Sequence, residues 1–326
     1  MKPLVSVVIP VFNTAGFIYD AVKSICDQTY SNLQILVMDD ASTDESIEQV
    51  KRIQDKRIEI YSSAVNKGQA YQMNLGIQKC KGDYVCIMHA DDIMYPEKIE
   101  KQLSFFLNDA SLGVCGCYIK VFGLQEAIWK YPYGDKECKD ILLSSVPFAH
   151  PAVMIRKSVL NVLDVVYNTD MAAAEDYDLW VRLADKTYFA NVQEVLLNYR
   201  IHDKQLSKTA KEKEIKLVEE IRMKMIRQLF NVEEKNVLLC YKTLYNSSEL
   251  ELNNVVKGIN ILWKANAKKR VFSDRVLKGR LRHQLVKAFS TVGFFKRLKT
   301  IVNSKTIIRV CFFKTLVRII IKPSVA

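Results

Sequence analysis

The sequence predicts an α/β protein with a doubly wound, mostly parallel sheet, followed by a basic and helical C-terminal region. Three observations predict this class. Short apolar runs alternate with stretches of helical periodicity over the first hundred residues, which is typical of parallel sheets. Two of these runs end in a pair of aspartates. The charge also changes sign: residues 1–203 hold 20 Lys and Arg against 27 Asp and Glu, whereas residues 204–326 hold 28 against 9.

The first apolar runs are short enough for strands and lack the polar alternation of a half-exposed sheet. We therefore expect them to be buried on both faces, as in a parallel sheet. The four expected strands are Val5–Ile9, Gln34–Met38, Ile58–Tyr61 and Tyr84–Met88.

Helix signals lie between these strands. Ser42 and Glu45 have the spacing of a capping box, which predicts a helix start near Glu45. A capping residue is also expected at Asn13 or Thr14, for a helix that ends near Gln28. Further helices are expected after Asn66-Lys67-Gly68 and from Pro96.

After about residue 110 the alternation is less regular, and from about Lys208 the sequence becomes helical and basic. We therefore predict two domains, residues 1–207 and residues 208–326. The later elements expected in the first domain are strands at Leu112–Val121, Ala152–Ile155 and Val192–Tyr199 and a helix at Glu175–Ala184.

The aspartate pairs, Asp39-Asp40 and Asp91-Asp92, directly follow two of the apolar runs. They should lie at the carboxyl ends of parallel strands, where open α/β sheets hold their ligands. Two carboxylates about 4 Å apart repel by roughly 4 kcal/mol at an effective dielectric constant near 20. A divalent cation or ligand donors relieve that repulsion. A solvated turn residue and a helix cap remain the alternative for either pair, but two pairs in the same context favour a site.

Several common site types are missing from the sequence. No GxGxxG or P-loop motif is present, so a metal held by aspartate is the natural partner for a nucleotide's phosphates. The eight cysteines form no CxxC pair, which argues against a structural zinc site. Cys80, Cys86 and Cys115 are expected as core thiols of a reducing compartment. Neither a signal peptide nor a membrane-spanning helix is expected.

Five segments resemble the family 2 inverting glycosyltransferases of the GT-A fold, of the bacterial surface-polysaccharide type. They occur in the family's order and spacing and cover about residues 4–203. The resemblance implies that the chain transfers a sugar from a nucleotide donor. The segments are Val5–Asn13, Val37–Asp44, Asn66-Lys67-Gly68, Met88–Asp92 and Glu175–Trp180.

The resemblance implies roles for residues that bind the nucleotide. Asp40 accepts a hydrogen bond from the base, which is expected to be uracil, and Asp39 supports the loop. Pro10, Val11 and Asn13 line the base pocket.

The second pair is implied to bind the rest of the donor. Asp91 lies near the ribose, and Asp92 binds Mn²⁺ or Mg²⁺ on the pyrophosphate as the last Asp of the family's DxD element. Ala90, or His89 one residue earlier, occupies the first position of that element, so fewer protein ligands hold the metal.

Asp176 matches the family's catalytic base. In a single displacement, a carboxylate removes the proton of the acceptor hydroxyl as it attacks the anomeric carbon, and one base is enough. Without the motif around it, Asp176 would be interpreted as a first-turn helix residue favoured by the helix dipole.

Other candidate residues carry less specific signals. Arg200 and His202 resemble a family element that approaches the diphosphate or the metal, and His202 is equally well interpreted as structural. His150 resembles a residue near the acceptor, although a lone histidine is more often structural. Trp180 is expected in the core, and Trp129 either stacks on an acceptor sugar or lies in a surface loop.

The C-terminal segment, residues 265–326, holds 16 Lys and Arg and a single acid, Asp274. Basic residues there recur among apolar clusters, which predicts a helix that lies on an anionic membrane. Nucleic-acid binding requires less exposed apolar surface, and a helical bundle with a solvated basic face is the alternative. The basic residues of the expected stripe are Arg309, Lys314 and Arg318.

Together these features predict a cytoplasmic, inverting hexosyl- or N-acetylhexosaminyl-transferase, peripheral at the inner face of the cell membrane. Its expected partners are a nucleotide-sugar, which the family resemblance implies to be a UDP-sugar, and a lipid-linked or surface-polysaccharide acceptor. The alternative is a noncatalytic polyanion- or membrane-binding protein on a degenerate transferase domain. A nucleotidyltransferase is disfavoured, because no Gly-rich loop with Lys or Arg lies near the first strand.

Overall fold

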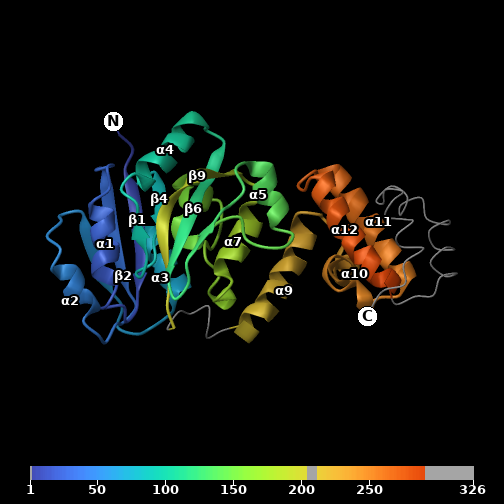
Figure 1. Cartoon of the computed structure of the whole chain (residues 1–326), viewed down its shortest axis with the longest axis horizontal. Coiled ribbons are helices and arrows are strands. Elements are labelled where there is room, and N and C mark those ends of the chain that lie inside the picture. Colours follow the sequence, from blue (N-terminus) through green and yellow to red (C-terminus); the bar gives the residue numbers. More distant parts are fainter. Residues whose placement is uncertain (1, 204–210, 291–326) are drawn as a thin grey trace. The chain divides into compact units, whose positions relative to one another are not determined.

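The computed structural model describes residues 2–203 and 211–290. The chain divides into two compact units, residues 1–218 and residues 219–326, and each is described by itself (Figure 1). The predicted domain boundary, between residues 207 and 208, lies outside the described residues.

The first unit is built on one sheet, in which apolar runs form parallel central strands. β1 pairs with β2 and β4 in parallel, and β2 pairs with β3 in the same way. β6 and β9 are also parallel, whereas β8 is antiparallel to both of its neighbours. The predicted α/β class is thus confirmed. The strands, in spatial order, are β3 (Ile58–Ser62), β2 (Leu33–Asp39), β1 (Val5–Val11), β4 (Tyr84–Ile87), β8 (Met154–Arg156), β6 (Leu112–Gly123), β9 (Tyr188–Ile201) and β5 (Ile93–Met94), with β7 (Ala127–Trp129) paired to β6.

Helices pack on both faces of this sheet because successive side chains of a strand point to opposite faces. Val7 and Ile9 of β1 share one core cluster with Ile18 of α1 and Ile99 of α4. On the other face, α3 contacts β1 and β2. The helices of the unit are α1 (Ile18–Cys26), α2 (Ser46–Lys51), α3 (Gln69–Lys79), α4 (Lys98–Asn108), α5 (Asp135–Ile141), α6 (Lys157–Leu160) and α7 (Glu175–Leu183).

Gly76 allows α3 to approach the sheet closely. A Cβ atom at this position would overlap Cγ1 of Val8 and lie 3.1 Å from Cγ of Met38. We expect Gly76→Ala to lower the free energy of unfolding by about 1–3 kcal/mol in urea denaturation, because the helix must move away from the sheet. Gly279→Ala is the control, since no atom of the described residues outside its own helical backbone lies within 4 Å of that Cβ, and it should raise stability by about 1 kcal/mol. Equal stability of Gly76→Ala and wild type would contradict this packing.

Two predicted helix caps are wrong. α2 does begin near Glu45, but the hydroxyl of Ser42 accepts a hydrogen bond from the backbone of Asn13 instead of capping the helix. α1 begins only at Ile18, because the Asn13 side chain is bonded to the backbone of Thr43. Both capping side chains therefore join the loops after β1 and β2.

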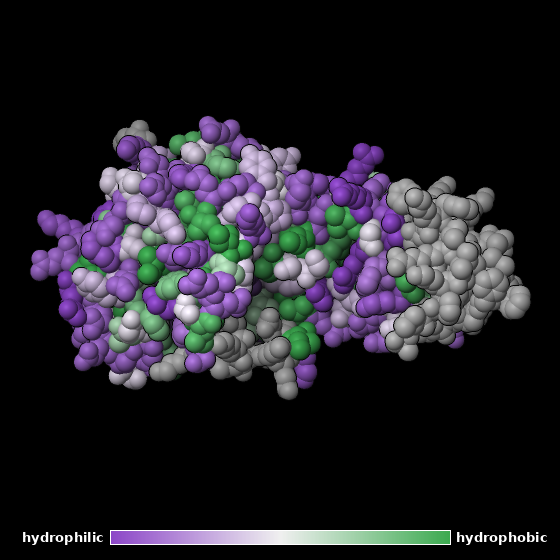
Figure 2. Space-filling model, viewed as in Figure 1, coloured by the Kyte–Doolittle hydropathy of each residue, from purple (hydrophilic) through white to green (hydrophobic). Residues whose placement is uncertain are grey.

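The space-filling view draws one face of the molecule (Figure 2). On the face drawn in Figure 2, hydrophilic side chains cover most of the described surface, with small groups of hydrophobic ones among them. The predicted core thiols Cys80, Cys86 and Cys115 are buried, and each described cysteine is a free thiol.

The second unit is helical over its described residues, as predicted. Buried leucines from successive helices, among them Leu244, Leu262 and Leu281, form its core. Among residues 2–203 and 211–290, no helix has the length and apolar character needed to cross a bilayer. The predicted basic stripe at Arg309, Lys314 and Arg318 lies outside the described residues. The helices are α9 (Lys211–Gln228), which runs across the division between the units, α10 (Glu234–Tyr245), α11 (Leu252–Lys269) and α12 (Asp274–Ser290).

Candidate active site

The carboxyl ends of β2, β1 and β4 lie along one edge of the sheet, because these strands are parallel neighbours. The two aspartate pairs follow β2 and β4, with β1 between them. This is the edge at which α/β sheets bind ligands. The predicted placement of both pairs is confirmed.

Asp40 is buried and holds the turn before α3. Its carboxylate accepts hydrogen bonds from the backbone N–H groups of Lys67 (2.8 Å) and Gly68 (2.7 Å) and from Nε2 of Gln72 (2.7 Å). Gly68 has φ +88°, a conformation that favours glycine. A carboxylate has about four acceptor positions, so one position remains for a ligand. Its predicted bond to the nucleobase stays a prediction.

The loops after β1 and β2 are joined by side-chain bonds. Oδ1 of Asn13 accepts from the Thr43 backbone N–H (2.8 Å), and Asp44 accepts from the backbone N–H of Ala15 (3.0 Å). Although partial burial opposes it, the bond from Ser46 and the backbone bonds lower the pKa of Asp44. Of the predicted base-pocket residues, Pro10 and Val11 are the last residues of β1, and Asn13 lies in this pair of joined loops.

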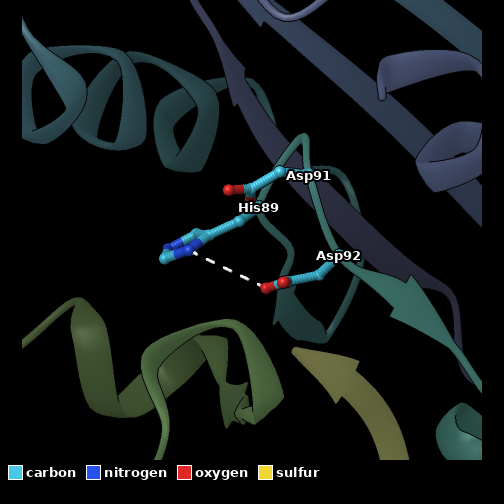
Figure 3. Close-up of side chains that lie close together, drawn as sticks. All are labelled: His89, Asp91 and Asp92. Carbon is cyan, nitrogen blue, oxygen red and sulfur yellow. Dashed lines mark ion pairs between the residues drawn. The ribbon is translucent and has the colours of Figure 1, made fainter. Parts of the chain in front are cut away.

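The second aspartate pair forms a cluster with His89 (Figure 3). One ligand atom from each of His89, Asp91 and Asp92 lies within 4.8 Å of the other two. Nδ1 of His89 lies 4.0 Å from Oδ2 of Asp92, and the two side chains point toward each other in Figure 3. His89 was considered from sequence only as a replaced position of the DxD element, and the structure brings it to the pair.

Asp92 has the properties of a cation ligand. It is 1% exposed. Its Oδ1 accepts a hydrogen bond from the backbone N–H of Arg200 (2.8 Å), whereas its Oδ2 has no hydrogen-bond partner among residues 2–203 and 211–290. Burial and the neighbouring Asp91 raise the pKa of Asp92 well above its usual range. A divalent cation beside Oδ2 would satisfy this atom and offset the repulsion within the pair. The residues thus fit the expected Mn²⁺ or Mg²⁺.

The end of β9 supports the pair from the other side. Nε of Arg200 donates to the backbone oxygen of Asp91 (2.9 Å), and Nε2 of His202 lies 3.0 Å from Oδ2 of Asp91. The structure therefore brings both residues to the pair, with His202 against Asp91 and not against Asp92. Its predicted role as a metal ligand stays a prediction. The end of β9 also borders a cavity of about 250 Å³, lined by Phe17, Gly123, Leu124, Arg200, Ile201, His202 and Asp203.

Asp176 lies in the first turn of α7, where the helix dipole favours a charged carboxylate. Its negative charge contributes to the raised pKa of Tyr199, for which burial is the main cause. Asp92 and Asp91 contribute to the same rise. Tyr199 therefore lies within electrostatic range of all three carboxylates, as expected if they serve one site.

The remaining predicted residues lie in different environments. Trp180 is fully buried against Phe148, so its predicted core position is confirmed. Trp129 is 41% exposed, and its ring lies 5.9 Å from that of Tyr199. His150 is buried and hydrogen-bonded to His89, so it contacts the cluster directly.

Sequence reasoning missed two residues that bear on the site, Gln72 and Tyr167. Gln72 bonds to Asp40 from the first turns of α3, and Tyr167 bonds to His150. Both are buried polar residues that meet the site through contacts between segments distant in sequence, and neither belongs to a local sequence motif. The position of His89, three residues before Asp92, was the one available signal.

Comparisons with known proteins identify the family and the fold of this chain. The model for "Glycosyl transferase family 2" matches residues 6–163. The O-antigen biosynthesis glycosyltransferase WbnJ of Escherichia coli is 30% identical over 220 residues, which are 64% of this chain and 83% of that protein.

Two solved structures are similar in fold. Staphylococcus aureus TarS 1–349 in complex with UDP-GlcNAc aligns with a TM-score of 0.62 at 16% identity, over 87% of this chain and 86% of that one. The mannosyltransferase PcManGT of Pyrobaculum calidifontis, in complex with GDP-Man and Mn²⁺, aligns with a TM-score of 0.57 at 17% identity, over 88% and 86%.

Proposed function

This chain belongs to glycosyl transferase family 2 and has the GT-A fold, and from that premise we propose that it is an inverting transferase for a UDP-linked hexose or N-acetylhexosamine. The observation that carries the proposal is the cluster of His89, Asp91 and Asp92 at the carboxyl edge of the sheet, in which the ligand atoms lie within 4.8 Å of one another and Oδ2 of Asp92 has no partner among the described residues. The two carboxylates suit a cation, and Asp176 in the first turn of α7 would supply the base for the reaction.

The nucleotide-sugar would bind at the carboxyl edge of the sheet. TarS binds UDP-GlcNAc and PcManGT binds GDP-Man, so related folds hold nucleotide-sugars. In this chain the remaining acceptor position of Asp40 would take an N–H of the base, and Pro10, Val11 and Asn13 would border it. Arg200 fixes the carboxylate of Asp92, so the diphosphate meets a side chain already oriented.

Asp176 would act on the acceptor. Its carboxylate takes the proton of the acceptor hydroxyl while that oxygen attacks the anomeric carbon, and the nucleoside diphosphate leaves from the opposite face. A divalent cation bound by Asp92, with Asp91 and His89 beside it, would neutralise the charge that develops on the leaving diphosphate. The stereochemical result is inversion, because the sugar undergoes one displacement.

The acceptor and the location are proposed on other grounds. WbnJ is an O-antigen biosynthesis enzyme, which supports a lipid-linked or surface-polysaccharide acceptor. The charge of the C-terminal region supports attachment to the anionic inner face of the cell membrane, where such an acceptor would be met.

A panel of nucleotide-sugars tests this function. We expect Mn²⁺-dependent release of UDP from one UDP-sugar, faster when the acceptor is present. Release of pyrophosphate would identify a nucleotidyltransferase instead. Absence of any nucleotide product from every donor would support the noncatalytic alternative, in which the domain only binds.

A further inference from the structure

A line of three hydrogen-bonding side chains runs from the aspartate pair into the interior. Nε2 of His89 lies 3.0 Å from Nδ1 of His150, and Nε2 of His150 lies 2.8 Å from the hydroxyl of Tyr167. His150 is 7% exposed and Tyr167 is fully buried. Asn74 bonds both the backbone N–H and the backbone oxygen of Tyr167, which fixes the far end of the line.

The bonds allow only two proton arrangements. Each neutral imidazole carries one N–H and one lone pair. The direction of the bond between the two rings therefore also fixes the direction of the bond between His150 and Tyr167. In the first arrangement, Tyr167 donates to His150, His150 donates to His89, and Nδ1 of His89 carries a proton. In the second, His89 donates to His150 and His150 donates to Tyr167, which leaves a lone pair on Nδ1 of His89. The amide nitrogen of Gln69 lies farther from Nε2 of His89, at 3.4 Å, so the bond to His150 decides the tautomer.

The surroundings of both ends favour the second arrangement. A proton on Nδ1 of His89 would draw Oδ2 of Asp92 into a hydrogen bond, but the two atoms are 4.0 Å apart and Oδ2 has no partner. Two ligands about 2.1 Å from one cation in an octahedral site lie about 3.0 Å apart when they are adjacent and about 4.2 Å apart when they are opposite, and 4.0 Å is close to the second value. The separation of 4.0 Å therefore fits two lone pairs that share a cation.

The hydroxyl of Tyr167 forms the other end of the line. When the hydroxyl of Tyr167 accepts from His150, its own hydrogen must turn elsewhere. The charges of Asp176 and Glu175 act on this hydroxyl, and both contribute to the raised pKa of Tyr167, for which burial is the main cause. Negative charge near this hydroxyl is compatible with an O–H that points away from His150.

We infer that His150 and Tyr167 are positioning residues that hold His89 in the tautomer with a free Nδ1 lone pair, so that His89 is a nitrogen ligand of the cation beside Asp92. This inference rests on the proposed function, in which a divalent cation accompanies the sugar diphosphate. Metal-binding histidines commonly donate their second nitrogen to a buried partner in this way. The first position of the DxD element then keeps a metal ligand, although its side chain is no longer a carboxylate.

Mn²⁺ binding to the full chain, without donor, tests the inference. Pulsed electron paramagnetic resonance should detect a nitrogen nucleus bound to Mn²⁺ in the wild type, and labelling of histidine with ¹⁵N should change that signal. His89→Asp should bind Mn²⁺ without the nitrogen signal, because a carboxylate replaces the ring. His202→Gln should keep the signal, since His202 faces Asp91 on the side of β9.

Tyr167→Phe tests the positioning role. It keeps the buried ring but removes the acceptor for His150, so the dissociation constant for Mn²⁺ should rise about tenfold or more. Tyr84→Phe is the matched control, because Tyr84 is also buried and its hydroxyl bonds only Arg156 among the described contacts. Its Mn²⁺ affinity should equal that of the wild type.

Two results would overturn the inference: a nitrogen signal that survives His89→Asp, or wild-type Mn²⁺ affinity in Tyr167→Phe. The proposed function fails separately. Transfer activity without any bound nitrogen would keep the function and reject His89 as ligand. A histidine-bound Mn²⁺ without nucleotide release from any donor would keep the metal site and reject the transferase.

Discussion

Asp176→Asn should lower kcat by about 10²- to 10⁴-fold and leave donor binding close to that of the wild type. The amide has nearly the shape of the carboxylate but cannot accept the acceptor's proton. Asp176 lies in the first turn of α7 and is proposed to act on the acceptor, so the contacts of the nucleotide with Asp40 and Asp92 should be kept. Steady-state kinetics with the UDP-sugar found in the panel, together with calorimetric titration of UDP, measure both quantities.

The control for this variant is Asp170→Asn. Asp170 is an exposed aspartate just before the same helix, and its neutralisation changes the local charge by the same amount. We expect it to keep wild-type kcat. If Asp176→Asn turned over at the wild-type rate, another group would have to be the base.

Asp92→Asn should lower kcat/KM by about 10²- to 10³-fold, because the cation that it helps to hold stabilises the charge of the leaving diphosphate. It should also remove the stabilisation by Mn²⁺, which is about 2.7 kcal/mol in the wild type at 100 times the dissociation constant. Thermal unfolding with and without Mn²⁺ measures this effect.

The metal-free protein gives an independent result for the same residue. Because the pKa of Asp92 is raised in the fold, the native state binds more protons than the unfolded state between the ordinary and the raised value. Metal-free stability should therefore fall as pH rises through that interval, and Asp92→Asn should remove this dependence. Asp83→Asn, an exposed aspartate just before β4, is the control and should preserve it. A metal-free wild type with no such pH dependence would contradict the burial of an ionisable carboxyl at this position.

Much of the fold could be predicted from the sequence, because parallel strands that are buried on both faces have continuous apolar sequences. Val5–Ile9 and Ile58–Tyr61 were predicted as strands and lie within β1 and β3. β5 was missed because two residues carry no periodicity. The start of α1 was misplaced because the side chain of Asn13 bonds Thr43, which is distant in sequence, and so does not cap the helix.

The candidate site also contains residues that could be predicted from the sequence and residues that could not. The aspartate pairs were found because their position after a strand is local in sequence. The partners of the pairs were not found: His89 meets His150 across 61 residues, and Asp91 meets His202 across 111. Such contacts depend on how strands β4, β8 and β9 are ordered in the sheet, which no local pattern records.

The support that β9 gives to the aspartate pair has a consequence for biosynthesis. A ribosome makes Asp91 and Asp92 more than a hundred residues before Arg200 and His202. A nascent chain arrested before β9 emerges would therefore expose two unsupported carboxylates, with β5 lacking its partner strand. Competence to take up the cation should be acquired late in translation, in a single step, when the last strand of the sheet is inserted.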